Sequence, residues 1–273
     1  MGLWLQQGLA AHYHNSHSPA EALDDAAKVI RLLADLKLRF ISQTELTYRQ
    51  ANSPVAVAGM GWCDGINGFA AAVLSHEFPR SEIVAVVDRL QRGGHSFGRV
   101  WSEQYRDWLY FDMWTDEVVV FRSRPGARAE ILARARPLGA RRLPQESPEV
   151  FRRMYDNAHS GFTQYRVQPT LGGYVFSRIA NLLSNGSRSP AGTVEAIAEA
   201  STITLPNDPR VLPPDGPVAK ADYVEARFHH LLGDENRARE AYARVVAAEG
   251  EPLSAYGRAA RIFIDRIEAR ARR

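Results

Sequence analysis

The sequence contains a single cysteine among 273 residues, Cys63, and this scarcity excludes several classes of protein. One cysteine cannot form a disulfide within the chain, so a small secreted scaffold held by disulfides is excluded. A zinc site built from several cysteines is excluded for the same reason. Without a second thiol, disulfide redox chemistry within the chain is excluded as well.

Long apolar runs and a strong charge of one sign are also missing. No stretch approaches the roughly 20 apolar residues that a membrane-spanning helix requires, so no membrane partner is predicted. Residues 1–15 contain no Lys or Arg and do not match a secretory signal, so we expect a cytoplasmic location. The 34 Lys and Arg against 31 Asp and Glu give a net charge of only +3. With 45% hydrophobic residues, the composition is that of a folded globular protein.

The first half of the chain changes from helical to strand-like patterns. Ser18-Pro19-Ala20-Glu21 is typical of a helix start, and apolar residues at helical spacing extend this helix to about Phe40. Residues 43–61 are expected to form a loop, and a second helix is predicted from near Cys63, ended by Pro79. Helices followed by an antiparallel meander indicate an α+β fold. The four predicted strands are Glu82–Leu90, Ser96–Ser102, Trp108–Met113 and Glu117–Arg122.

A segment rich in Arg and Pro separates the two halves. Between Arg122 and Arg153, nine Arg stand against three Glu, and four Pro residues interrupt the segment. We therefore predict one domain over residues 1–124, a connection over residues 125–150 and a helical domain over residues 151–273. The basic segment lacks regularly interleaved aromatic residues, so we interpret it as a solvated connection or helix face and predict no nucleic-acid partner. An acidic partner, such as a carrier protein or a sugar nucleotide, stays open.

The C-terminal region has its clearest pattern over Ala219–Glu249. Ala226, Ala238 and Tyr242 predict two helices that cross closely, with Gly233-Asp234 as the turn between them. The spacing resembles a single degenerate tetratricopeptide repeat. Because such repeats need about three copies to be stable alone, we interpret the segment as an αα-hairpin docked on its own chain.

Three short segments hold candidate catalytic residues. Cys63 follows Gly61-Trp62 at a predicted helix start, where the positive end of the helix dipole favours a thiolate. His95 begins one predicted strand and Asp112 lies in the next. If the hairpin between them is centred near residues 103–104, the two side chains lie directly opposite each other, whereas a slip of one residue would separate them. Asp112 can then accept the Nδ1–H of His95 and orient the imidazole toward a thiol.

These residues, in this order, resemble the core of the transglutaminase-like superfamily. The likeness covers Ala20 to Phe121 and rests on Cys63 with a helix behind it, then His95 leading an aromatic-rich strand, then Asp112. It implies a papain-like site in which Cys63 is the nucleophile, His95 the general base and acid, and Asp112 the orienting acid. It also implies attack on an acyl carbon and transfer of the acyl group to water or an amine, as in crosslinkers, peptidases, amidases and amide-forming homologues.

The chain departs from the family pattern near each of these residues. Phe97 stands where the family often has a tryptophan, Met113-Trp114-Thr115 follows Asp112 where Pro-Thr is common, and Asn67 stands where a small residue is usual. These changes leave the three candidate catalytic residues intact and do not identify the substrate class.

Further residues are predicted to line the site. The backbone N–H of Cys63 is one predicted oxyanion donor, and an upstream side chain supplies the second. The candidates for that side chain are Gln43, Tyr48 and Gln50. The predicted substrate-binding residues are Trp62, Gln50, Tyr48 and Phe97. No cofactor and no metal are expected.

The sequence therefore predicts a cysteine-dependent acyltransferase, amidase or peptidase. Its substrate would be a peptide, a small molecule or a carrier-bound acyl group. The alternative is an inactive transglutaminase-like scaffold that binds a protein partner through its C-terminal helices. The presence of Cys63, His95 and Asp112 together favours the enzyme, because an adaptor requires none of them. A carboxylate among the aromatic neighbours of Asp112 also requires a partner, since an unpaired buried charge is costly.

Overall fold

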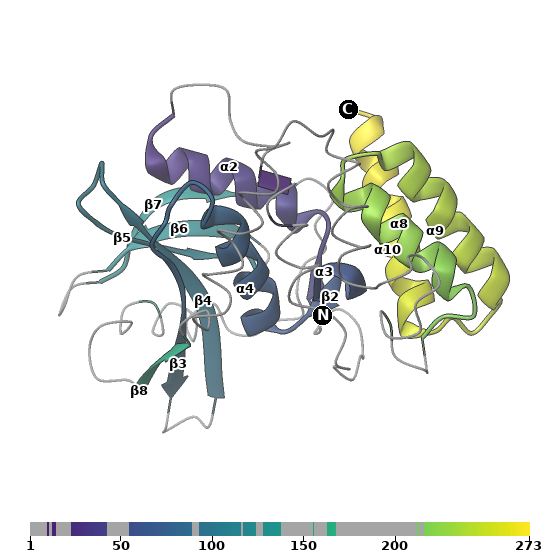
Figure 1. Cartoon of the computed structure of the whole chain (residues 1–273), viewed down its shortest axis with the longest axis horizontal. Coiled ribbons are helices and arrows are strands. Elements are labelled where there is room, and N and C mark those ends of the chain that lie inside the picture. Colours follow the sequence, from purple (N-terminus) through teal and green to yellow (C-terminus); the bar gives the residue numbers. More distant parts are fainter. Residues whose placement is uncertain are drawn as a thin grey trace.

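The structure is a computed structural model of the whole chain. It describes residues 10, 13–14, 23–42, 55–88, 93–115, 117–123, 128–137, 155, 163–167, 212 and 216–273. Helices and an antiparallel sheet share one chain, which confirms the predicted α+β class. The sheet lies on one side of the molecule and the last three helices lie on the other (Figure 1). None of the helices in the described ranges is both long enough and apolar enough to cross a membrane.

The described residues contribute six strands to one antiparallel sheet, five from the first half of the chain and one from residues 163–167. Its strand order is β7-β6-β5-β4-β3-β8, and the four strands in the middle are those predicted from the sequence. The strands are β3 (Ser81–Asp88), β4 (Gly93–Ser102), β5 (Asp107–Asp112), β6 (Val118–Arg122), β7 (Glu130–Ala135) and β8 (Thr163–Val167).

The two outer strands, β7 and β8, contradict the sequence predictions. β7 lies in the Arg-rich segment interpreted as a solvated connection or helix face, and β8 lies in a region expected to be helical. Glu and Ala in β7 have low β-propensity, so pairing with β6 outweighs the local preference. Ile131 in β7 is 55% exposed, so apolar and polar residues of this strand do not alternate between a buried and an exposed face.

Two helices cover one face of the sheet. They are α2 (Asp25–Lys37), which packs on β6 and β7, and α4 (Cys63–Leu74), which packs on β3 and β4. The side chain of Asp24 caps α2 by accepting from the N–H of Ala27 at 2.7 Å. This described helix starts later than predicted, while the predicted cap at Ser18 lies outside the described residues. The predicted second helix is confirmed at its start, and it ends at Leu74, before Pro79.

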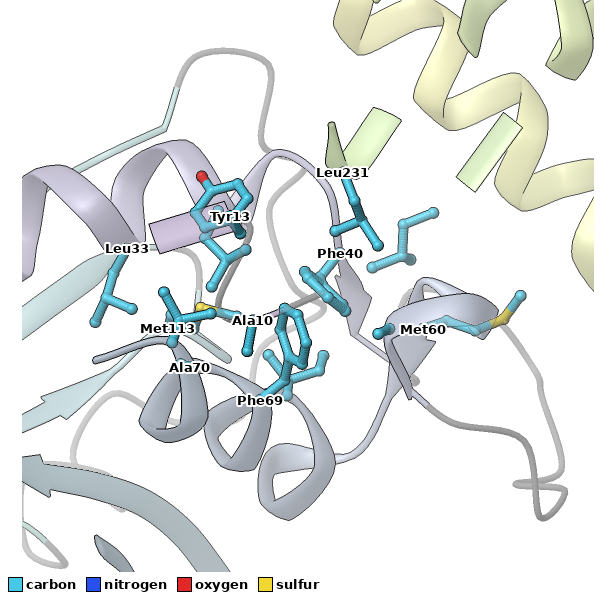
Figure 2. Close-up of a cluster of buried hydrophobic side chains, with 14 of the residues drawn as sticks. Ala10, Tyr13, Leu33, Phe40, Met60, Phe69, Ala70, Met113 and Leu231 are labelled. Atoms are coloured by element: carbon cyan, nitrogen blue, oxygen red, sulfur yellow. The ribbon is translucent and has the colours of Figure 1, made fainter. Parts of the chain in front are cut away.

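The core between these helices is built from large apolar side chains. Phe69 of α4 faces Phe40, with ring centroids 5.3 Å apart, and Leu33 and Met113 lie in the same buried cluster (Figure 2). Full burial of each such side chain stabilises the fold by about 1.5–3 kcal/mol. The packing fixes α4 against the sheet and thereby fixes the residue at its start, Cys63.

The predicted loop over residues 43–61 contains short regular elements near its end. These are α3 (Val55–Ala58) and β2 (Met60–Gly61), and β2 pairs in parallel with β1 (Ile41–Ser42). The loop prediction is therefore wrong for this part. Gly59 joins α3 to β2 at a φ of +69°, and an added Cβ there would lie 2.6 Å from the guanidinium carbon of Arg227. Elements of four and two residues are too short for a hydrophobic periodicity to be detected in the sequence.

Three helices form the C-terminal part. They are α8 (Lys220–Leu231), α9 (Glu235–Glu249) and α10 (Ala255–Ala271). The predicted hairpin over 219–249 is confirmed, with Gly233 at a φ of +84° in the turn and Ala226, Ala238 and Tyr242 fully buried. The likeness to a tetratricopeptide repeat stays a prediction.

The helix α8 is attached to the segment that leads to Cys63. The buried guanidinium of Arg227 donates from Nη2 to the carbonyl of Ala56 at 2.9 Å, and the hydroxyl of Tyr223 donates to the carbonyl of Ala58 at 2.7 Å. Leu231 of α8 joins the same apolar cluster as Phe40 (Figure 2). The division into domains at residues 124 and 150 stays a prediction.

Candidate active site

Cys63 is the first residue of α4, and its sulfur lies against β4. The backbone N–H of Ser96 donates to the sulfur at an N–S distance of 3.4 Å. The residue before the helix, Trp62, makes no side-chain capping bond, and the hydrogen bonding of the helix begins with the N–H of Ile66. The N–H groups of the first turn therefore point out of the helix end, beside a partly exposed thiol.

His95 and Asp112 form a buried pair next to this thiol. The Nε2 of His95 lies 2.6 Å from the Oδ2 of Asp112, and the exposed fractions are 3% and 0%. The sequence analysis expected the Nδ1 of His95 to face the carboxylate, and this expectation is wrong. Because Nε2 is used by Asp112, Nδ1 is the ring nitrogen left for the thiol.

The register between β4 and β5 also differs from the expected one. Gly98 pairs with Phe111 and Ser102 pairs with Asp107, so the same register places Phe97, not His95, opposite Asp112. The prediction was wrong by two residues. Because side chains alternate with a period of two, this shift keeps His95 and Asp112 on the same face as diagonal neighbours. A long side chain such as His reaches across that diagonal.

The electrostatics of the pair favour two charged groups. Burial by itself lowers the pKa of His95, but the charge and hydrogen bond of Asp112, with a smaller effect of Cys63, raise it from 6.5 to about 10. Burial raises the pKa of Asp112, but His95 and hydrogen bonds from Tyr155 and Asn67 outweigh it, and the pKa is lowered from 3.8. At neutral pH His95 is therefore an imidazolium that carries a proton on both ring nitrogens.

Aromatic rings surround the pair on the side of the helix start. The ring of Trp114 lies 5.5 Å from that of His95 and 6.5 Å from that of Trp62. Trp114 is buried, whereas Trp62 is 40% exposed. Of the predicted substrate-binding residues, Trp62 is thus placed beside the thiol with an open face.

The other predicted substrate-binding residues are not placed in this way. Phe97 is fully buried and packs 5.9 Å from the ring of His95, so it supports the imidazole from within the core. Tyr48 and Gln50 lie outside the described residues, as does Gln43, the further candidate for the oxyanion site.

Two residues at the site have roles that the sequence analysis missed. Tyr155 donates from its hydroxyl to the Oδ2 of Asp112 at 2.5 Å, and Asn67 donates from Nδ2 to the Oδ1 of Asp112 at 2.9 Å. Tyr155 gave no signal, because it is separated from Asp112 by 43 residues. Asn67 gave a weak one: it is a polar residue one helical turn after Cys63, at the edge of an apolar stripe.

The chain matches no family model, no curated protein and no solved structure. Within the part of the chain that the structure describes, no group of three or more His, Cys, Asp or Glu side chains is placed to hold a metal ion. A thiol beside an imidazolium that is paired with a carboxylate is suited to nucleophilic attack on an acyl carbon.

Proposed function

We propose that this chain is a cysteine-dependent acyltransferase or amide hydrolase with a transglutaminase-like core. The observation that carries the proposal is the buried pair of His95 and Asp112 next to Cys63 at an uncapped helix start. The same order of residues and the passage from helix to antiparallel sheet support it. A reducing cytoplasmic location suits an enzyme that depends on one free thiol.

The proposed reaction has two steps. Cys63 attacks the acyl carbon as a thiolate and forms a thioester, while the bond from the acyl carbon to the leaving amine or thiol breaks and His95 gives that group the proton on Nδ1. Water or an amine then attacks the thioester. Nδ1 of His95 takes the proton of the attacking group, the carbon–sulfur bond breaks, and Cys63 leaves with its electron pair as a thiolate. Asp112 stays ionised throughout and holds the ring through Nε2.

The start of α4 is the proposed site for the oxyanion. The N–H groups of Cys63, Asp64 and Gly65 lie in the first turn, before the first bonded amide of the helix at Ile66. The positive end of the helix dipole adds to their effect on a developing negative charge. Of these three donors, the N–H of Cys63 belongs to the same residue as the reacting sulfur.

The proposed acyl donor is an amide or a thioester, on a peptide, a small molecule or a carrier. Trp62 offers an exposed aromatic surface next to Cys63, which suits contact with the apolar part of the donor. A protected position for an amine acceptor would make the protein a transferase, and access of water would make it an amidase or peptidase.

The alternative is an inactive scaffold that binds a partner through its C-terminal helices. The inner faces of these helices are already occupied by the chain itself, as the bonds of Arg227 to Ala56 and of Arg266 to Phe40 illustrate. The enzyme is therefore favoured, and the two proposals make opposite predictions for Cys63→Ala.

Treatment of the native full-length protein with iodoacetamide at neutral pH tests the proposal. We expect Cys63 to be alkylated faster than the same cysteine in the urea-unfolded protein, because only the folded chain places His95 beside it. A Cys63 that reacts no faster when folded would contradict the enzyme proposal. A binding activity that survives Cys63→Ala and requires residues 216–273 would favour the scaffold.

A further inference from the structure

The carboxylate of Asp112 accepts four hydrogen bonds. Its Oδ2 accepts from the Nε2 of His95 at 2.6 Å and from the hydroxyl of Tyr155 at 2.5 Å. Its Oδ1 accepts from the Nδ2 of Asn67 and from the backbone N–H of Trp114, each at 2.9 Å. A carboxylate offers about four acceptor positions, so every one of them is used. Rotation of the group would break all four bonds together.

Asn67 lies where β4 and β5 separate. The register of the two strands would place Ser96 opposite Met113 two residues beyond the last bonded pair, Gly98 and Phe111. The amide of Asn67 stands between them instead. Its Nδ2 donates to the carbonyl of Ser96 at 2.9 Å, and its Oδ1 accepts from the N–H of Met113 at 3.0 Å.

This position of Asn67 connects all three proposed catalytic residues. Asn67 is fully buried and follows Cys63 by one turn on the same face of α4. It binds the carbonyl of Ser96, the residue next to His95, and the carboxylate of Asp112. A single amide therefore fixes the start of the helix relative to both strands.

Tyr155 binds the carboxylate oxygen that Asn67 does not bind, Oδ2. Its ring packs 4.5 Å from Phe121 and 5.5 Å edge-to-face from Phe97, which holds the hydroxyl in place. Burial, together with the neighbouring charge of Asp112, raises the pKa of Tyr155 well above 10. The hydroxyl therefore remains a donor over the whole range in which the site would work.

We propose that Asn67 and Tyr155 are positioning residues that hold the carboxylate of Asp112 aimed at the Nε2 of His95. This inference rests on the proposed function, since it assigns them to the same site. The titratable groups that the described elements bring to the carboxylate are His95 from β4 and Tyr155, with Cys63 of α4 beyond the imidazole. Loss of a donor favours the protonated carboxyl group, which leaves the imidazolium without its counter-ion.

Two variants and one matched control test this inference. Tyr155→Phe removes one donor and keeps the ring. Asn67→Asp keeps the shape of the side chain but places a second carboxylate beside the Oδ1 of Asp112, so that one of the two must hold a proton. Tyr110→Phe is the control, because it removes a buried hydroxyl from the same aromatic cluster that contacts Arg99 and not Asp112.

The first readout is the rate of Cys63 alkylation at about pH 5 divided by the rate at about pH 7.5. We expect this ratio to fall in Tyr155→Phe and in Asn67→Asp, and to stay unchanged in Tyr110→Phe. The second readout is the proton resonance of the His95 Nε2–H in the NMR spectrum, which reports the bond to Asp112 whether or not Cys63 reacts. We expect it to shift in both variants and not in the control.

The outcomes separate this inference from the proposed function. If wild-type Cys63 is inert but the His95 resonance shifts in the two variants, the positioning role stands and the proposed enzyme is contradicted. If wild-type Cys63 is reactive while neither the rate ratio nor the resonance differs from the control, the positioning role is overturned and the enzyme stands. A folded Tyr155→Phe protein, verified by circular dichroism, is sufficient for either result should Asn67→Asp not fold.

Discussion

Replacement of Asp112 by Asn removes the charge that holds His95 protonated and keeps the size of the side chain. Burial lowers the pKa of His95, but this charge contributes to a net rise from 6.5 to about 10. At about 1.4 kcal/mol per pKa unit, the net rise corresponds to roughly 5 kcal/mol. Loss of one partner of a buried ion pair usually costs about 3–5 kcal/mol. Because the substitution also removes the cost of burying the carboxylate, we expect the lower value, about 3 kcal/mol at pH 6.

The effect of this substitution depends on pH in a defined direction. The folded-state pKa of His95 is raised, so its contribution to stability is complete below pH 6.5 and is lost as the pH rises through about 10. The folded-state pKa of Asp112 is lowered, so its contribution is present above the unfolded value of 3.8 and is lost as the pH falls through the folded-state pKa. The stability difference between wild type and Asp112→Asn should be largest from about pH 4 to 6.5 and shrink toward about pH 10.

Urea unfolding at a series of pH values, followed by tryptophan fluorescence, measures this difference. Asp107→Asn is the matched control, because it makes the same change on the same strand. Asp107 lies 3.7 Å from Arg122 in a partly exposed pair, which is worth less than about 1 kcal/mol. A difference for Asp112→Asn that is constant with pH, or no larger than that of Asp107→Asn, would refute the reasoning.

Three further substitutions have defined outcomes. His95→Ala should slow iodoacetamide alkylation of Cys63 about tenfold at pH 7, because the neighbouring cation is lost; an unchanged rate would speak against their pairing. Gly98→Ala should lower the free energy of unfolding by about 1–3 kcal/mol in urea titrations, because the added Cβ would lie 1.9 Å from the ring of Phe111, which is fully buried. Arg227→Met should lower the melting temperature, because the carbonyl of Ala56 in α3 loses both of its Arg227 donors at a cost of about 1–3 kcal/mol. An unchanged or raised melting temperature would contradict this.

The central elements of the fold are predictable from the sequence because their patterns are long. The strands β3 to β6 are rich in Val, Phe, Tyr and Trp, and α4 has an apolar stripe over more than two turns. β7 lacks such a pattern, since this edge strand has no buried residue, and β8 is only five residues long. β7 is held by pairing with the preceding strand β6, whereas β8 pairs with β3 across about 80 residues of sequence, as in the pair Ile83 and Val167.

Three members of the site were predictable from the sequence, but its geometry was not. Cys63, His95 and Asp112 stand out by residue type and order, whereas the register depends on the turn. The turn occupies residues 103–106, with Arg106 at a φ of +50°, so the hairpin is centred one residue later than expected and the pairing shifts by two residues. The role of Asn67 could not be read from spacing, because its partners lie 29 to 46 residues away in the chain.

The central claim is that Cys63 attacks acyl carbon with the help of His95 and Asp112. Incubation of the native full-length protein with a small acyl thioester at neutral pH, followed by peptide mapping in a mass spectrometer, tests it most directly. We predict one acyl group on Cys63 in the wild type, much less in His95→Ala and Asp112→Asn, and none at this position in Cys63→Ser. Acylation of surface lysines with no acyl group at Cys63, or equal labelling of Cys63 in the His95→Ala protein, would contradict the claim.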